Sequence, residues 1–560
     1  MESEKKKNIG NYSSSDERAI FDKFDKKVTR RKALSVAAKV GIAGAIGVIV
    51  GVVGGYFAGS AVAPPKTITV TQTQRLTETV TSTVGAATVT VTERVTETRI
   101  VTATTPITPT VWKPKLEPAE ITVLSSPDCA DYLKYAAEEF MKIYPQIRVE
   151  VVPLSWEALY PKILSDLQSR TGVYDVFTID VMTLGSVVEA GAACFDDIMK
   201  EHPDIVDPNL DIADFEPMYF GYGSVWAGKV YGFPVYPNHM FLFYRKDYFE
   251  DPKIRDQFKA KTGKPLKVPE TWEECIEVAR FFTRDYNPDS PTEFGIALMF
   301  PTTHTMMYNV LNWLGPIRQS PTGLSKYGKL DLYYGDYCTA DGKVWFANED
   351  GARAVKLIQD LLPYAPDPFG SDYGETVAQF SAGTTAMCPQ WSVPYGDFAK
   401  ALAGGDLMKA REIIGVEMMP GIIDQGQLVR KPVSGGWALG INNFISDAEK
   451  RAAFVFAEFA TSKEMDLIHW TKFVMPPARM SNWERPEARE VLSPALFDTY
   501  AKSMRSLSYR PRIPQEPEME RIGNPLWQDI IAGRKPLMDG LKELANEWQK
   551  LVDQFKHPGR

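Results

Sequence analysis

From Ala119 onward the sequence alternates between strand-like and helix-like segments, and this pattern constrains the fold more than any other feature. The strand-like segments are 120–124, 148–152 and 174–180, and apolar residues at helical spacing mark 132–144 and 159–167. Such alternation is typical of a parallel sheet covered by helices on both faces and connected by right-handed crossovers. Ligands bind beyond the carboxyl ends of strands in these sheets, which is where Asp128 and Asp180 fall. We therefore predict an α/β fold with both aspartates at a binding edge.

The length of the chain indicates more than one compact body. At 560 residues it exceeds what one ordinary core holds, so we expect two lobes with additional segments. Apolar spacing predicts further helices at 352–362, 448–459 and 537–555. Thr271 is followed three positions later by Glu274, which predicts a helix that starts with a capping box.

An uncharged apolar run at 40–63 is long enough to cross a bilayer as a helix. It follows a basic cluster made of Lys26, Lys27, Arg30, Arg31 and Lys32. By the positive-inside rule, residues 1–39 are then cytoplasmic and the rest of the chain is extracellular. A cleavable twin-arginine signal is the alternative, because 29–34 has that form and 61–63 resembles a cleavage site. Pro64 disfavours cleavage, so we expect an uncleaved, single-pass anchor.

Residues 64–118 have a different composition, with threonine and valine at every second place through much of the segment. These β-branched residues favour extended backbone. With no aromatic residue before Trp112, the segment has little to bury, and it is typical of a stalk that spaces a folded domain from the membrane. The alternative is an edge-forming strand that associates with itself.

Charge and cysteine usage exclude several classes of partner. The formal net charge is −8, and the basic cluster at 26–32 adjoins the apolar run, so we expect no nucleic-acid partner. The cysteines form no CxxC pair and no Cys/His cluster, so we expect no metal site. They are Cys129, Cys194, Cys275, Cys338 and Cys388. We interpret them mainly as small buried residues, and one or two disulfides remain open.

Motifs for catalysis are missing from the sequence. It contains no HExxH, no GxSxG, no phosphate-binding loop and no GxGxxG that opens a helix. The five histidines are scattered, and adjacent carboxylates such as Asp196 and Asp197 point to different faces of a helix. We therefore expect a protein that is not an enzyme and has no cofactor.

A set of motifs does resemble one known family. In order, the motifs are 144–149 with Trp156, 174–180 with 189–191, 228–236 with 242–247, 269–274, 380–387 with Trp391, and 434–441. Together they resemble the family 1 extracellular solute-binding proteins, especially the trehalose/maltose-type receptors of ABC importers. The resemblance covers Ala119 to the C-terminus, and the anchor and Thr-rich stalk look like those of archaeal surface receptors.

This resemblance implies a two-lobed α/β fold of the periplasmic-binding-protein type (class II), with a hinge of several crossings. Lobe 1 would hold 119–235 and 433–488, and lobe 2 would hold 236–432 and 489–560. The chain would first cross between the lobes near 234–238. The lobes would close around a small-molecule ligand, and the permease subunits of the importer would sense the closed form of a monomer.

The resemblance also nominates site residues. A sugar site needs aromatic faces together with carboxylates, amides and arginine. Trp391 and Trp437 match tryptophans that stack on sugar, with core packing as the alternative. Asp180 matches a ligand-binding aspartate, and helix capping is its alternative role. The other candidates are Tyr236 and Asn238 on the crossing, Gly435 and Gly436 for close backbone approach, Arg479, Asp128 and Trp156. For Arg479 the alternative is a surface ion pair.

One departure from the pattern keeps the cargo open. The segment 125–129 does not match the glycine- and glutamate-rich first loop of trehalose/maltose receptors. A di- or oligosaccharide is the expected cargo, and a polyol, a peptide or a glycerol phosphate is the alternative. A surface-tethered glycan hydrolase or an adhesive surface protein is a further alternative, since fold alone does not fix function.

Overall fold

The computed structural model describes residues 70–84, 87–101, 113–486 and 493–559, the first two ranges by backbone alone. The expected cytoplasmic segment 1–39 and the expected anchor 40–63 lie outside these residues. None of the helices within the described ranges has the length and apolar character needed to cross a membrane. Residues 22–112 and 113–560 belong to separate compact units, and each is described by itself.

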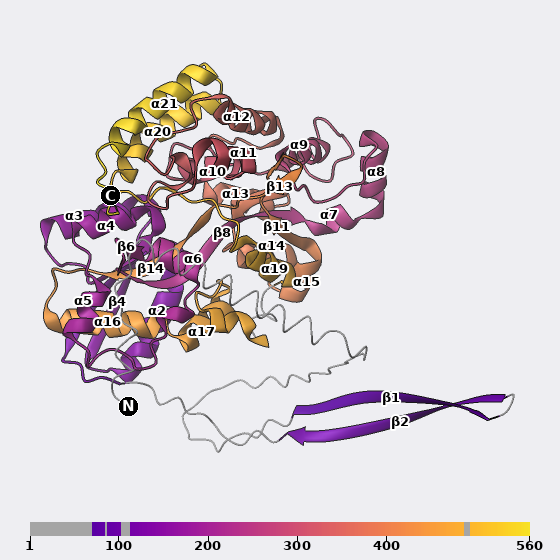
Figure 1. Cartoon of the computed structure of the whole chain (residues 1–560), viewed down its shortest axis with the longest axis horizontal. Coiled ribbons are helices and arrows are strands. Elements are labelled where there is room, and N and C mark those ends of the chain that lie inside the picture. Colours follow the sequence, from indigo (N-terminus) through magenta and orange to yellow (C-terminus); the bar gives the residue numbers. More distant parts are fainter. Residues whose placement is uncertain (1–69, 85–86, 102–112, 487–492, 560) are drawn as a thin grey trace. The chain divides into compact units, whose positions relative to one another are not determined.

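The Thr-rich segment contains two strands, β1 (Val70–Val84) and β2 (Ala87–Val101). They pair as an antiparallel hairpin in which Val84 lies opposite Ala87 and Val70 lies opposite Val101 (Figure 1). The extended backbone that the sequence indicates is therefore present, but the strands fold back on each other. That the segment serves as a stalk stays a prediction.

The first half of the globular unit is built on parallel strands, as the alternation predicts. The strands are β3 (Ala119–Ser125), β4 (Ile147–Pro153) and β5 (Val176–Asp180), with β14 (Ser434–Ile441) antiparallel to β5. The covering helices are α2 (Pro127–Ile143), α3 (Trp156–Ser169), α4 (Leu184–Ala190), α5 (Phe195–Glu201), α6 (Pro217–Gly223), α16 (Asp447–Ala460) and α17 (Lys463–Phe473). A short hairpin of β6 (Val225–Trp226) and β7 (Lys229–Val230) precedes the crossing.

The long strand β8 (Phe233–Arg245) belongs to both halves of the unit. Residues up to His239 pair with β14, and residues from Met240 onward pair with β10 and β11. In the described residues the result is one eight-stranded sheet in the order β4-β3-β5-β14-β8-β10-β9, with β11 also paired to β8. The exchange of partners next to residues 234–238 makes β8 a physical crossing between two half-sheets.

The second half-sheet contains β9 (Phe294–Ile296), β10 (Thr385–Trp391) and β11 (Ile414–Met418) beside β8. Its helices are α7 (Lys246–Glu250), α8 (Pro252–Thr262), α9 (Trp272–Phe281), α10 (Thr305–Arg318), α11 (Pro321–Tyr327), α12 (Glu349–Leu361), α13 (Tyr373–Ser381), α14 (Tyr395–Ala403), α15 (Leu407–Ile413), α19 (Pro494–Ser503), α20 (Glu516–Ile531) and α21 (Leu537–Val552). A small hairpin of β12 (Ile422–Asp424) and β13 (Gln427–Val429) precedes the return to β14.

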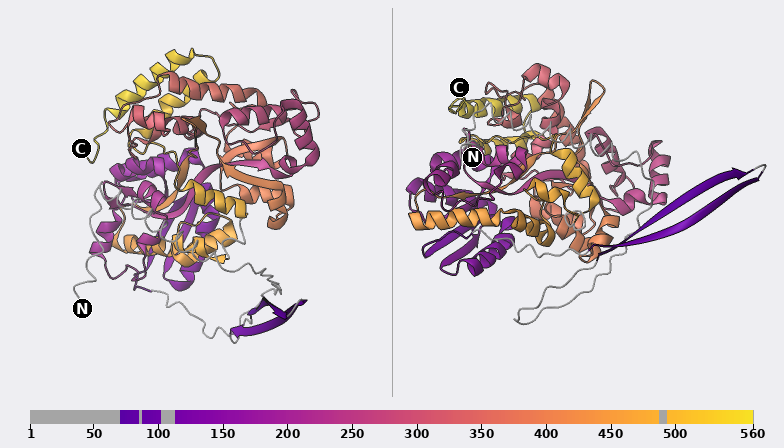
Figure 2. Two further views of the ribbon diagram at one scale, coloured as in Figure 1. Left: turned by 45° about the vertical axis from the view of Figure 1, so that its right-hand side comes forward. Right: turned by 60° about the horizontal axis from the view of Figure 1, so that its bottom comes forward.

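The predicted helices and caps are present. The segments 352–362, 448–459 and 537–555 correspond to α12, α16 and α21, and Thr271 with Glu274 forms a capping box at the start of α9. The C-terminal helices α20 and α21, yellow in Figure 1 and Figure 2, lie beside α10 and α12. The elements thus divide around β8 into two lobes, whose predicted bounds at 235, 433 and 488 stay predictions.

All five cysteines lie in the described part of the chain and are free thiols. Cys129, Cys275, Cys338 and Cys388 are buried, and Cys194 is partly exposed. Their interpretation as small buried residues is confirmed for four of them. The burial of each of these four raises the pKa of its thiol, which keeps the thiol neutral.

Candidate functional site

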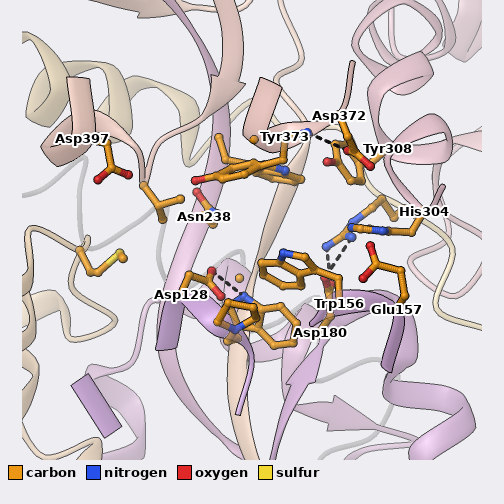
Figure 3. Close-up of a pocket in the computed structure, with 18 of the residues that line it drawn as sticks. Asp128, Trp156, Glu157, Asp180, Asn238, His304, Tyr308, Asp372, Tyr373 and Asp397 are labelled. Atoms are coloured by element: carbon orange, nitrogen blue, oxygen red, sulfur yellow. Dashed lines mark hydrogen bonds and ion pairs between the residues drawn. The ribbon is translucent and has the colours of Figure 1, made fainter. Parts of the chain in front are cut away.

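A cavity of about 620 Å³ lies where the two half-sheets meet, at the carboxyl ends of the parallel strands (Figure 3). Of the predicted site residues, it is lined by Asp128, Trp156, Asp180, Asn238, Trp391, Gly436 and Trp437. The volume falls in the range of pockets for small molecules. Side chains separated by more than 380 positions in the sequence therefore meet at the edge that the strand pattern predicts.

Asp180 anchors the wall from lobe 1. It ends β5, lies opposite Trp437 in the pairing of β5 with β14, and accepts a hydrogen bond from the backbone N–H of Met182. Its carboxylate also forms a two-pronged ion pair with Arg510, at 2.5 Å from Nη2 and 3.2 Å from Nη1. Asp180 therefore caps a helical turn and also faces the cavity, and its contact with a ligand stays a prediction.

Arg510 was not predicted from the sequence. Its side chain is only 2 % exposed, and burial alone would lower its pKa, but the adjacent Asp180 raises the pKa above its usual value. The guanidinium stays charged and ties the segment after α19 to the end of β5. Its neighbours in the sequence, Tyr509 and Pro511, form no motif that marks this position.

Aromatic rings cover opposite walls of the cavity. From lobe 1, Trp437 and Trp156 lie with ring centroids 5.2 Å apart. From lobe 2, Trp391 and Tyr308 lie 4.9 Å apart. Trp391 and Trp437 are largely buried, yet each presents part of its ring to the cavity. The arrangement provides two apolar faces between which a flat, partly apolar ligand fits.

Two hydrogen bonds hold the carboxyl group of Asp128 in place. The hydroxyl of Tyr236 and the indole N–H of Trp437, the latter at 3.1 Å, both donate to its Oδ2. Burial raises the pKa of Asp128, and its Oδ1 has no hydrogen-bond partner in the described residues. Tyr236 is fully buried and does not line the cavity, so its predicted ligand contact is corrected to a positioning contact on Asp128.

Asn238 lies on β8 and faces the cavity. Its amide oxygen accepts hydrogen bonds from the backbone N–H and the hydroxyl of Ser392, at 3.2 and 2.6 Å. Its amide nitrogen makes no hydrogen bond among the described residues, so two N–H donors remain for a ligand. Asn238 is buried in the wall of the cavity, and its contact with a ligand stays a prediction.

Gly436 lines the cavity, whereas the adjacent Gly435 does not. Gly436 lines the cavity and has a φ of +135°, a conformation that favours glycine. Gly435 does not line it, because the ring of Trp391 covers it: a Cβ at this position would come within 2.8 Å of that ring. Gly435 therefore lets Trp391 pack closely and is corrected from a ligand contact to a packing position.

The structure overturns the prediction for Arg479. Its side chain donates to the carbonyl oxygens of Thr461 and Asp211, at 2.8 and 2.6 Å, and covers the ring of Phe215. It is 2 % exposed and lies outside the cavity lining. Arg479 is neither a ligand contact nor an exposed ion pair, because its guanidinium is used to satisfy buried carbonyl groups.

Most of the lining from lobe 2 escaped prediction. The missed residues include His304, Tyr308, Asp372, Tyr373, Glu375 and Asp397. They come from the starts of α10, α13 and α14 rather than from strand ends. One of these positions has a sequence pattern that could have been recognised, because Asp372 and Glu375 form a capping box at the start of α13. The carboxylate of Asp372 also accepts hydrogen bonds from the hydroxyls of Thr303 and Thr305.

Two lobes that share a strand and enclose an aromatic, carboxylate-lined cavity define a two-lobed ligand-binding protein. The chain belongs to the bacterial extracellular solute-binding protein family, which it matches over residues 125–466. It is thus a solute-binding protein of the class that serves ABC importers. The α/β fold expected from the sequence is confirmed.

Similar proteins agree with this assignment. A probable amino-acid ABC transporter periplasmic-binding protein of Sinorhizobium fredii is 25% identical over 347 residues, which is 61% of this chain and 68% of that protein. Maltose-bound MalE3 of T. maritima has a TM-score of 0.63 at 20% identity, covering 77% of this chain and all of MalE3. A ribitol-bound solute-binding protein of Agrobacterium radiobacter K84 has a TM-score of 0.62 at 22% identity, covering 78% and 99%.

Proposed function

We propose that this protein captures a sugar, of disaccharide size or larger, and delivers it to the permease of an ABC importer by closing its lobes around it. The observation that carries the proposal is the pair of aromatic walls. Trp391 with Tyr308 faces the cavity from lobe 2, and Trp437 with Trp156 faces it from lobe 1. Sugar rings have an apolar face that stacks on such rings and hydroxyls that need polar partners.

The polar groups between the walls suit hydroxyls. The free amide nitrogen of Asn238 supplies donors, and the unpartnered Oδ1 of Asp128 supplies an acceptor. A buried acceptor without a donor is costly, so a ligand hydroxyl that reaches Oδ1 recovers that free energy on binding. Structures with bound maltose and ribitol among the similar proteins support a polyhydroxyl cargo.

Closure follows from the same arrangement. A ligand that touches both walls binds the closed form better than the open form, and this difference in affinity shifts the lobes toward closure. Residues 1–63 hold the monomeric receptor on the membrane with its binding domain outside the cell, and 64–118 form the stalk. The permease of the importer reads the closed form, and no chemical step occurs on the receptor.

Calorimetric titration tests this function directly. The purified full-length chain is titrated with mono-, di- and oligosaccharides, with polyols and short peptides in parallel. We expect one sugar class to bind with micromolar or tighter affinity. Trp391→Ala should weaken that binding by about 10- to 100-fold, since it removes a stacking face.

The matched control keeps an aromatic ring. Trp391→Phe should retain most of the affinity, and near-ultraviolet circular dichroism verifies that both variants fold. If peptides bind and no sugar gives a measurable heat of binding, the sugar assignment is refuted. Turnover of any bound sugar would favour the hydrolase instead.

A further inference from the structure

A second chamber of about 410 Å³ adjoins the ligand cavity. The two spaces share Trp156, Glu157, Asp180, His304 and Trp437 in their walls. Trp156 and His304, both labelled in Figure 3, line both spaces, and their ring centroids are 6.1 Å apart. A ligand held between the aromatic walls therefore has room to extend one substituent or one further unit into this chamber.

The far wall of the chamber carries two carboxyl groups from α20. Glu516 and Glu520 stand four positions apart, so they share one face of the helix. Glu516 is 1 % exposed, and its Oε2 and the Oε1 of Glu520 are buried without a donor among the described residues. With no outside donor, the two groups can satisfy each other only by sharing a proton.

No lysine or arginine in the structure's described ranges lines the chamber, and the groups that face it do not supply a free cation. Those groups are Asp180 at the end of β5, Arg510 before α20, Tyr160 and Glu157 on α3, Tyr337 at the end of η3 (Gly335–Tyr337), and His304 before α10. The fork of Arg510 is taken up by Asp180. Burial lowers the pKa of His304, which keeps its ring neutral.

The lining of the main cavity is also rich in carboxylates and poor in cations. Within the described residues its lining contains seven carboxylates and a single guanidinium, that of Arg510. Asp131, Glu157 and Asp397 make no ion pair there, although each faces the cavity. An anionic cargo such as a glycerol phosphate would meet repulsion, and the carboxylate of an amino acid would find no free cation.

We propose that the cargo is a sugar that carries a protonated amine, and that Glu516 and Glu520 bind this amine in the second chamber. The inference rests on the proposed sugar-binding function and specifies its substrate class. An ammonium group has three N–H donors and no acceptor, which matches two carboxyl groups that lack donors. A neutral hydroxyl would supply only one donor and would leave one of the two unpartnered oxygens without a hydrogen bond.

The pair also predicts release of a proton on binding. Burial raises the pKa of Glu520 to about 8 and that of Glu516 well above its usual value, so the empty chamber favours protonated carboxyl groups. An arriving ammonium favours the ionised carboxylates, and the displaced proton passes to the solvent. Affinity for the amino sugar should therefore rise with pH up to the pKa of its amine and decline above that value, giving a bell-shaped profile.

The test uses sugars that differ only in their charge. Cellobiose, diacetylchitobiose and the corresponding β-1,4-linked glucosamine disaccharide share one skeleton, and glucose with glucosamine and galactose with galactosamine extend the comparison. Titrations of the full-length chain at pH 7 should show the amine bound at least about tenfold more tightly than its hydroxyl counterpart. The measured enthalpy should depend on the ionisation enthalpy of the buffer for the amine only.

Two variants and one control assign the effect to the chamber. Glu520→Gln and the double change Glu516→Gln with Glu520→Gln should abolish the amine preference and the proton release, while affinity for the hydroxyl counterpart stays within about threefold. Glu518→Gln is the control, because Glu518 lies on the same helix, pairs with Arg521 and does not line the chamber. It should behave like the wild type. If a Gln variant does not fold, the wild type alone tests the proposal: a binding enthalpy for the amine that does not depend on the buffer would overturn it.

The outcomes separate the two proposals. Equal binding of amino and neutral sugars overturns the amine inference and leaves the sugar receptor intact. A preference for amines that survives both Gln variants overturns the assignment to the chamber. If no sugar binds while a diamine or a lysine-containing peptide does, the proposed function fails as well.

Discussion

The ion pair between Arg510 and Asp180 leads to a quantitative stability prediction. The side chains are 2 % and 18 % exposed, and the pair joins two segments 330 positions apart. Removing one partner of a buried pair typically costs about 3–5 kcal/mol, and the partial exposure of Asp180 to the cavity reduces this to about 2–4 kcal/mol. We therefore expect Arg510→Met to lower the free energy of unfolding by about 3 kcal/mol without ligand.

Most of that cost is the charge left behind on Asp180. The double change Arg510→Met with Asp180→Asn should consequently be more stable than Arg510→Met alone, with a coupling of at least about 2 kcal/mol in a double-mutant cycle. Urea unfolding at pH 7, followed by tryptophan fluorescence, measures Arg510→Met, Asp180→Asn and the double change beside the wild type. Arg521→Met is the control, because Arg521 forms an exposed pair with Glu518 and its loss should cost less than about 1 kcal/mol. A cost for Arg510→Met no larger than the control, or simple additivity in the cycle, would refute this reasoning.

Three further predictions concern packing, pH and attachment. Gly435→Ala should displace the ring of Trp391 and weaken sugar binding by about tenfold in calorimetry. Gly396→Ala should leave binding unchanged, because Gly396 is not part of the cavity lining and a Cβ there would come no closer than 3.9 Å to the Cβ of Val474. Burial raises the pKa of Glu458 to about 8 from 4.5, so stability from this group is greatest below pH 4.5 and is lost as the pH rises to 8. Glu458→Gln should therefore gain in unfolding temperature relative to wild type from pH 5 to pH 8, and parallel curves would contradict this. Deleting residues 1–63 should move the chain from the membrane fraction to the soluble fraction, and retention on the membrane would argue against the anchor.

Local patterns account for what the sequence could predict. The strands of lobe 1 and their helices carry their periodicity within a few residues, and Asp128 and Asp180 are placed by the rule for strand ends. Trp391 and Trp437 end or lie on strands β10 and β14, so they too are found by reading strands. These residues could be predicted because each lies on a regular strand or just after one.

The remaining site residues depend on long-range contacts that no local pattern encodes. Arg479 and Arg510 both follow short, irregular segments, and only the folded chain determines which of them faces an aspartate in the cavity. Glu516 and Glu520 appear as ordinary charged residues of an amphipathic helix in the sequence. Their burial arises from α3 and β5, which come more than 300 positions earlier in the chain.

The shared strand β8 has a mechanical consequence. Because its neighbours change between His239 and Met240, a rotation of the lobes would twist the strand at this point, and displacement would grow with distance from it. Asn238 is adjacent to this point, and Trp391 pairs with Met240, so both would scarcely move. Trp156 on α3 and Tyr308 on α10 lie outside the paired strands and would move farther. The amide of Asn238 and the ring of Trp391 would thus position the ligand in the open receptor, before rotation of the lobes brings the remaining rings against it.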